Sequence, residues 1–144
     1  MIEIKRASAS PFTTETVWNA GLAGTGVAGN DRSLTVGHEG DWVPEHLLLL
    51  AAESCFMSML LSLASAAGIT VLGYVSSGHF EVPDDIQLAP SVSLAPCIVV
   101  ASDADAERIA ACAKQAEKDS VVAQLLGSRL RITIDIRRLP PSDS

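Results

Sequence analysis

Aromatic residues and positive charge are both scarce in this chain of 144 residues. Phe, Trp and Tyr make up 4% of it, and 17 Asp and Glu outnumber 10 Lys and Arg, which leaves a net charge of −7. A nucleic-acid-binding surface needs cations for phosphates and usually aromatic rings for stacking bases. We therefore expect neither nucleic acid nor an anionic membrane surface as a partner.

Cysteine and histidine are also few, and their spacing does not suggest metal ligands. The residues are Cys55, Cys97, Cys112, His38, His46 and His79. An odd number of cysteines without a C-x-x-C pair indicates neither a disulfide framework nor a zinc site. We expect no metal and no cofactor.

No segment has the features of a signal peptide or a clear membrane span. Residues 1–10 lack an apolar core. The apolar run from Leu47 to Leu63 is interrupted by Glu53 and three serines, and no basic residues flank it closely. We expect a cytoplasmic protein, in a compartment where thiols stay reduced.

The order of elements predicts an α+β fold with a largely antiparallel sheet. Hydrophobic residues make up 48% of the chain, enough for one domain over residues 1–144, with 139–144 as a loose tail. Asp103 is the expected cap of the second main helix, and Pro90 and Pro96 imply bends or an edge position in their strand. The expected strands are 2–10, 14–20, 33–36, 69–82, 86–101 and 129–138; the two main helices are 44–68 and 104–118, and 121–126 is an extra helical turn.

The glycine-rich segment 21–32 predicts turns and bulges, with Asn30-Asp31 as a hairpin tip. Gly24, Gly26 and Gly29 spell G-x-G-x-x-G, the pattern of a dinucleotide-binding loop. That loop requires a helix directly after it, and here the flanks predict strands. We interpret the match as chance.

The segment from Pro44 to Gly68 predicts a long helix that is apolar on nearly every side. Pro44 suits a first helical turn, and Gly68 suits a helix end. One sheet cannot bury such a helix completely, so we expect a second copy to cover it in a homodimer.

Cys55, near the middle of this helix, is the main candidate for chemistry. A reactive thiol needs nearby positive charge or hydrogen-bond donors, and its sequence neighbours supply no cation. By spacing alone, an inert buried cysteine is the more common outcome, and Cys97 and Cys112 are interpreted as packing residues. Glu45 precedes Cys55 by ten residues, which is about 15 Å along a straight helix. The two side chains can therefore meet only across a dimer, and otherwise Glu45 is a helix-start carboxylate.

The segment Pro44–Phe56, with Pro-Glu followed by a cysteine ten positions after the glutamate, resembles the helix of the OsmC/Ohr family. The run 94–100, the end of the second helix at 116–118 and the final strand are similar to the second half of that family. Trp18 and the glycine-rich segment fit its N-terminal hairpins.

The resemblance implies an intertwined homodimer of α+β subunits with the long helices at its centre. It implies a peroxidase for organic hydroperoxides, in which Cys55 is oxidised to a sulfenic acid. Glu45 would hold an arginine that lowers the pKa of the thiol; Arg32 and Arg6 are the candidates for that arginine.

One departure from the family concerns the resolving cysteine. The family carries it in a segment similar to residues 116–122, where this chain has Ser120. A serine cannot form a disulfide, and Cys112 is eight residues upstream, about 12 Å along a helix. We therefore expect a one-cysteine peroxidase that uses an external thiol as reductant. The alternative is a non-catalytic dimer of the same fold that binds a small hydrophobic ligand.

Overall fold

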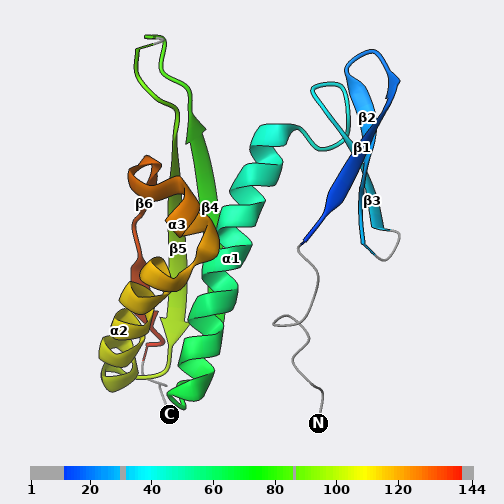
Figure 1. Cartoon of the computed structure of the whole chain (residues 1–144). Coiled ribbons are helices and arrows are strands. Elements are labelled where there is room, and N and C mark those ends of the chain that lie inside the picture. The colour runs from blue at the N-terminus through cyan, green and yellow to red at the C-terminus, as the bar shows by residue number, and fades with distance from the viewer. Residues whose placement is uncertain (1–11, 30–31, 86, 141–144) are drawn as a thin grey trace. The chain divides into compact units, whose positions relative to one another are not determined.

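The structure, a computed structural model, describes residues 12–29, 32–85 and 87–140. These residues form two compact units that divide between Leu47 and Leu48, within the long helix α1 (Figure 1). Each unit has its own sheet. The expected strand at 2–10, the hairpin tip Asn30-Asp31 and the last four residues of the expected tail lie outside the described residues.

The first unit contains a three-stranded antiparallel sheet of order β1-β2-β3. Its strands are β1 (Thr14–Ala20), β2 (Ala23–Ala28) and β3 (Arg32–Val36). The expected strands at 14–20 and 33–36 are confirmed. The expectation of turns throughout the glycine-rich segment is wrong, because Gly24 and Gly26 lie inside β2 and pair with strands on both sides.

Residues 24–28 of the G-x-G-x-x-G sequence therefore lie in strand β2 and Gly29 in the turn after it. The chance interpretation is confirmed, because β3, not a helix, follows the motif. The glycine at position 24 has a steric reason. A Cβ atom there would lie 2.7 Å from the carbonyl oxygen of Val17 on β1. Close approach of the two backbones thus excludes a side chain at this position.

Helix α1 (Pro44–Ala66) starts at Pro44 as expected. It ends just before Gly68, whose φ of +73° is the left-handed conformation typical of a glycine that terminates a helix. The helix buries a single stripe at every fourth position: Ala52, Phe56, Leu60 and Ala64. Most of its other apolar residues are only partly buried. By length and hydropathy alone α1 could span a membrane, but core helices of soluble proteins pass the same test.

The second unit contains a mixed sheet in which β5 is the central strand. Its strands are β4 (Gly73–Glu81), β5 (Ser91–Val100), β6 (Leu130–Ile132) and β7 (Asp135–Arg138). β4 pairs antiparallel with β5, whereas β6 and β7 pair parallel with it. The α+β class is confirmed, while the largely antiparallel pairing holds for the first sheet and for β4 with β5.

The expected continuous final strand is interrupted between Ile132 and Asp135. The register places Leu94 opposite Ile132 and Cys97 opposite Asp135, so Pro96 lies beside the interruption. Proline has no backbone N–H to donate to a neighbouring strand. The hydrogen bonding between β5 and the final strand is therefore interrupted where this donor is missing. An edge position for Pro96 is wrong, because β5 is paired on both sides.

Helices α2 (Asp103–Asp119) and α3 (Val121–Leu126) follow β5, and a short 3₁₀ turn (Gly127–Arg129) leads into β6. The cap of α2 is Ser102, one residue before the expected Asp103, and its hydroxyl accepts a hydrogen bond from the amide of Asp105. Asp103 instead pairs with Arg138, at 2.9 Å. The extra helical turn at 121–126 is confirmed as α3.

The helices pack on the face of the second sheet to which alternate residues of β5 point (Figure 1). Phe56 of α1, Ile98 of β5 and Ile109 of α2 are each at most 1% exposed and lie in one cluster. A second cluster, around Ala52 and Leu94, receives Val122 and Leu126 of α3. These two clusters fix α1 against the α2–α3 junction.

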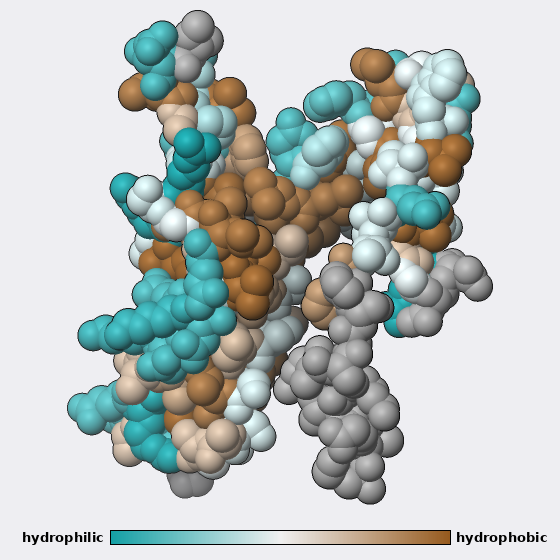
Figure 2. All heavy atoms as spheres, in the orientation of Figure 1, coloured by the Kyte–Doolittle hydropathy of each residue, from teal (hydrophilic) through white to brown (hydrophobic). Residues whose placement is uncertain are grey.

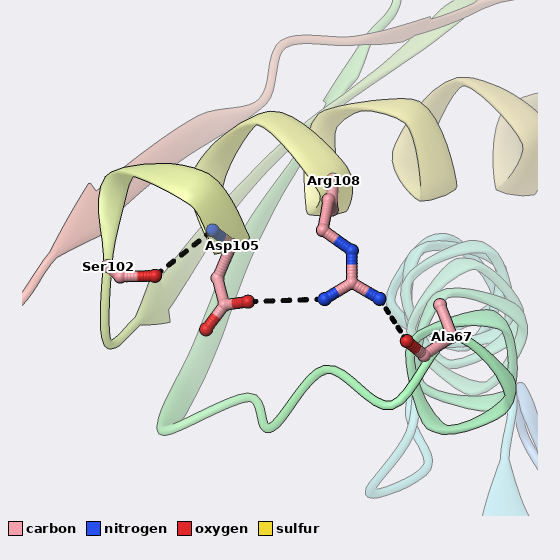
Figure 3. Close-up of polar contacts among 4 residues, drawn as sticks. All are labelled: Ala67, Ser102, Asp105 and Arg108. Atoms are coloured by element: carbon pink, nitrogen blue, oxygen red, sulfur yellow. Dashed lines mark hydrogen bonds and ion pairs between the residues drawn. The ribbon is translucent and has the colours of Figure 1, made fainter.

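Arg108 of α2 contacts the chain at the C-terminal end of α1 (Figure 3). Its guanidinium donates to the carbonyl oxygen of Ala67 and lies 3.5 Å from the carboxylate of Asp105. The last carbonyls of a helix lack intrahelical partners and carry partial negative charge. The arginine therefore satisfies and neutralises the C-terminal end of α1.

Candidate functional site

Cys55 lies near the middle of α1, beside the buried stripe and at the side of the helix that faces the α2–α3 junction. Its side chain is partly buried, and its thiol is free. Ala52 and Phe56 of the stripe fix this stretch of helix in the two core clusters. The packing therefore holds the sulfur in a defined position.

Ser120 brings a hydroxyl to this sulfur. The side chain of Ser120 is buried, at 1% exposure, and its Oγ donates a hydrogen bond of 3.1 Å to the Sγ of Cys55. The same residue ends α2 and starts α3, and its Oγ accepts from the amide of Ala123 at 3.4 Å. Because an amide can only donate, the hydroxyl proton is left to point at the sulfur.

These surroundings change the acidity of the thiol. Burial raises the pKa of Cys55, but the hydroxyl of Ser120 and the amides of Val122 and Val121 hydrogen-bond the thiolate and lower it. The lowering contributions prevail together, so the pKa lies below that of an ordinary cysteine. The thiolate is the nucleophilic form, and this position favours it through neutral donors.

Glu45, the second predicted site residue, lies in the first turn of α1. It precedes Cys55 by ten residues of one continuous helix, or about 15 Å, so the helix does not bring the two side chains together. The Oε1 atom of Glu45 is buried and has no hydrogen-bond partner among the described residues. A buried carboxylate oxygen of this kind needs a donor from elsewhere.

The described residues of the second unit supply no arginine to Cys55. Arg32 begins β3 in the first unit, and Arg6 lies outside the described residues. Among residues 48–85 and 87–140 of the second unit, no arginine donates a hydrogen bond to Cys55. The donors to its sulfur are the serine hydroxyl and backbone amides.

The other two cysteines are also free thiols. Cys112 packs against the main core cluster from α2, and Cys97 lies on the sheet face opposite to the buried residues of β5. No group of His, Cys, Asp and Glu in the described part of the chain is arranged to hold a metal ion.

A second polar group occupies the α1–β4 contact. Glu53 is two positions from Cys55 and therefore points from a different side of α1, where its carboxylate lies against Gly78. Burial raises the pKa of Glu53. Burial and the charge of Glu53 raise the pKa of Tyr74 to about 12. The side-chain oxygens of Tyr74 and Ser76 are buried, and neither has a hydrogen-bond partner among the described residues.

The sequence predicts Cys55 as the reactive thiol and Ser120 in place of a resolving cysteine, but it does not predict the hydrogen bond between the two side chains. The sequence does show a serine directly before a predicted helical turn, and a serine in this position is typical of a helix cap. A cap directs its side chain at local amides, and nothing local indicated that its hydroxyl would also meet a residue on another helix.

Comparison with known proteins gives the family. The model of the family described as OsmC-like protein matches residues 37–135. Among curated proteins, no match was found. All the similar solved structures described below are under 25% identical to this chain, so they support the fold alone.

Three solved structures illustrate the likeness. An OsmC-like protein of unknown function from Vibrio cholerae is 16% identical, with 88% of this chain and 99% of that chain covered and a TM-score of 0.74. The organic hydroperoxide resistance protein OsmC from Legionella pneumophila is 13% identical, with 90% and 99% covered and a TM-score of 0.66. The organic hydroperoxide resistance protein OhrB of Bacillus subtilis is 16% identical, with 89% and 100% covered and a TM-score of 0.64. With the family model matching most of its length, the chain belongs to the OsmC-like protein family.

Proposed function

We propose that this chain is a cysteine-based peroxidase that reduces organic hydroperoxides, with Cys55 as its nucleophile. The observation that carries the proposal is the thiol itself: it is partly accessible, it accepts hydrogen bonds from Ser120 and backbone amides, and its pKa is lowered. Solved structures of the same fold include proteins named for organic hydroperoxide resistance.

The first step is a two-electron transfer. The Cys55 thiolate attacks the terminal oxygen of the hydroperoxide, an S–O bond forms and the O–O bond breaks. The sulfur becomes a sulfenic acid, and the departing alkoxide takes up a proton and leaves as an alcohol. Thiolate is consumed in this step, so a lowered pKa increases the reactive fraction near neutral pH.

The second stage requires a reductant from outside the chain. Ser120 occupies the position beside Cys55 where the family carries its resolving cysteine, and a hydroxyl cannot form a disulfide. An external thiol attacks the sulfenic acid, which gives a mixed disulfide and water. A second thiol then releases Cys55 and leaves as the oxidised disulfide.

The surroundings of the thiol suit an apolar substrate. Val121 and Leu125 of α3 are exposed by 61% and 81%, and Figure 2 shows apolar residues gathered over this helix. An exposed apolar surface beside a thiol attracts the carbon chain of an alkyl hydroperoxide more than it attracts hydrogen peroxide.

The proposal includes a cytoplasmic homodimer. In the apolar stretch of α1, 22% of the residues are buried. Leu50, for example, is 45% exposed. A second copy of the chain is the simplest cover for this surface. In the dimer, a residue of that copy donates a hydrogen bond to the Oε1 atom of Glu45, which has no partner among the described residues. In that dimer Glu45 acts by holding an arginine near the thiol.

The activity is tested by stopped-flow mixing of the reduced protein with tert-butyl hydroperoxide, with peptide-resolved detection of the sulfenic acid. Cys55 is expected to react much faster than free cysteine, and Cys55→Ser is expected to abolish peroxide consumption. Cys97→Ser and Cys112→Ser are matched controls that keep it. A reaction of Cys55 no faster than that of free cysteine removes the proposal.

The dimer is tested by light scattering after gel filtration. The natural chain is expected at twice its 15.1 kDa mass. Leu50→Lys is expected to shift it toward the monomer, because a lysine there opposes burial of the α1 surface. A monomeric natural chain contradicts this part of the proposal.

A second candidate function is the binding of a small hydrophobic ligand without catalysis. The supporting observation is an apolar cavity of about 700 Å³ within the first unit, whose lining includes Val27, Leu34 and Val36. Calorimetry with decanoic acid tests it: binding by the natural chain and loss of binding in Leu34→Asp are expected. Binding that persists in a Cys55→Ser chain, together with an unreactive Cys55, favours this function over the first.

A further inference from the structure

Ser120 takes part in three elements at once. It ends α2, caps α3 and contacts α1 through the sulfur of Cys55. Its exposure is 1%, so its hydroxyl has no access to bulk water and depends on these partners. The amide of Ala123 satisfies an acceptor site of the hydroxyl, and the sulfur of Cys55 receives its proton.

We propose that Ser120 is a positioning residue for the peroxidase reaction: its buried hydroxyl holds the Cys55 sulfur and stabilises it as a thiolate. This inference rests on the proposed function for its purpose. The serine gains and loses no electrons in the reaction.

Neutral donors suffice for this role. A hydrogen bond to a charged acceptor is stronger than one between neutral groups, and burial strengthens it further. A hydroxyl beside a thiol therefore favours the anionic form over the neutral form. The lowered pKa of Cys55 agrees with this geometry.

The charged groups on the elements around Cys55 do not account for the stabilisation of its thiolate. On α1, the carboxylate of Glu53 lies against Gly78 on another side of the helix. At the end of α2, Asp119 accepts from Gln115, and Lys118 is exposed. Glu117 lines a small cavity toward β6, and α3 contains no ionisable residue. None of these charges contributes to the shift in the pKa of Cys55.

The test measures the pH dependence of iodoacetamide alkylation at Cys55, resolved by peptide mass in the full-length reduced chain. Ser120→Ala is expected to move the midpoint of the profile to higher pH. Near neutral pH it slows alkylation by roughly 3- to 10-fold, which is one lost hydrogen bond to a charge, partly offset by the higher intrinsic nucleophilicity of a more basic thiolate. Ser120→Thr keeps a hydroxyl and is expected to restore the natural profile.

Two controls separate this role from a structural one. Gln124→Ala removes a hydrogen bond of 2.9 Å to the carbonyl oxygen of Lys118 and so loosens the α2–α3 junction while leaving the hydroxyl in place. Ser54→Ala removes a hydroxyl one residue from Cys55 that donates to Ala51 instead. Both are expected to keep the natural alkylation profile, and circular dichroism verifies that every variant is folded.

The outcomes distinguish this inference from the proposed function. A folded Ser120→Ala chain with an unchanged profile overturns the inference, and so does a Gln124→Ala chain whose profile shifts as far. A shifted profile in Ser120→Ala and restoration in Ser120→Thr support it. If that pattern holds while tert-butyl hydroperoxide leaves the natural chain unoxidised, the hydroxyl stabilises the thiolate and the peroxidase proposal alone fails.

Discussion

Ser120 and Cys55 are 65 residues apart in the chain, yet the Oγ of one lies 3.1 Å from the Sγ of the other. The contact joins the end of α2 to the middle of α1. Both ends of it are fixed by packing, because α1 and α3 share an apolar cluster around Ala52. The two β-carbons are therefore held within reach of a covalent bridge.

Ser120→Cys is accordingly expected to form an intramolecular disulfide with Cys55. A disulfide needs its two sulfurs at about 2.05 Å and its β-carbons at about 3.5–4.5 Å, and small side-chain rotations supply the difference. Mild oxidation with diamide followed by mass analysis under non-reducing conditions measures the bond. Ala123→Cys, on the next turn, is the matched control and is expected to stay reduced. A Ser120→Cys chain that forms only intermolecular disulfides contradicts the geometry.

Arg108 links α2 to the last carbonyls of α1, and its removal is expected to destabilise the second unit. Arg108→Ala leaves the carbonyl of Ala67 without its donor and the helix end without its counter-charge, at a cost of about 1 kcal/mol. Urea unfolding at one fixed protein concentration measures the change. The exposed Arg129, in the turn before β6, provides the control: Arg129→Ala is expected to change the free energy of unfolding by less than about 0.5 kcal/mol. Equal effects of the two substitutions contradict the role of Arg108.

The parts of the fold predicted correctly are those with a strong local pattern. The Thr- and Val-rich segment at 14–20 forms a strand, and the apolar segment from Pro44 to Gly68 forms a helix with a glycine stop. Alternation of isoleucines predicted the final strand, but not its interruption. That interruption lies beside Pro96 of another strand, and pairing between strands cannot be read from either segment alone.

The parts that were missed depend on contacts made elsewhere. Glycines disfavour strands, so the sequence predicts turns where β2 lies. Hydrogen bonding to a neighbouring strand on each side stabilises β2. The helix and the resemblance predict Cys55 as the reactive candidate. The donor to its sulfur comes from the α2–α3 junction, and a serine cap carries no sequence signal for a partner 65 residues away.

Gly24 tests the steric account of β2. Gly24→Ala places a Cβ 2.7 Å from the carbonyl oxygen of Val17, and the backbone shift it forces is expected to cost about 1–3 kcal/mol in the stability of the first unit. The control is Gly29→Ala, where an added Cβ meets nothing within 4 Å. Fluorescence of Trp18, on the strand paired with β2, follows unfolding of this unit. Equal stability of the two variants contradicts the close approach of β1 and β2.

Tyr74 is the one tyrosine of the chain, so its ionisation can be followed by tyrosinate absorbance without interference. Burial and the charge of Glu53 raise its pKa to about 12, compared with about 10 in an unfolded chain. The folded state thus prefers the neutral phenol. The stability that this preference contributes is fully present below pH 10 and is lost as the pH rises through the folded pKa of about 12.

Glu53→Gln separates the two causes of this shift. It removes the charge and leaves the burial, so the midpoint of the Tyr74 titration is expected to fall but to stay above the ordinary value for tyrosine, since burial is the larger cause. Glu15→Gln, in the exposed strand β1, is the control and is expected to leave the midpoint unchanged. A Tyr74 that titrates at the ordinary value in the natural chain means that its hydroxyl reaches water, and the α1–β4 contact is then looser than described.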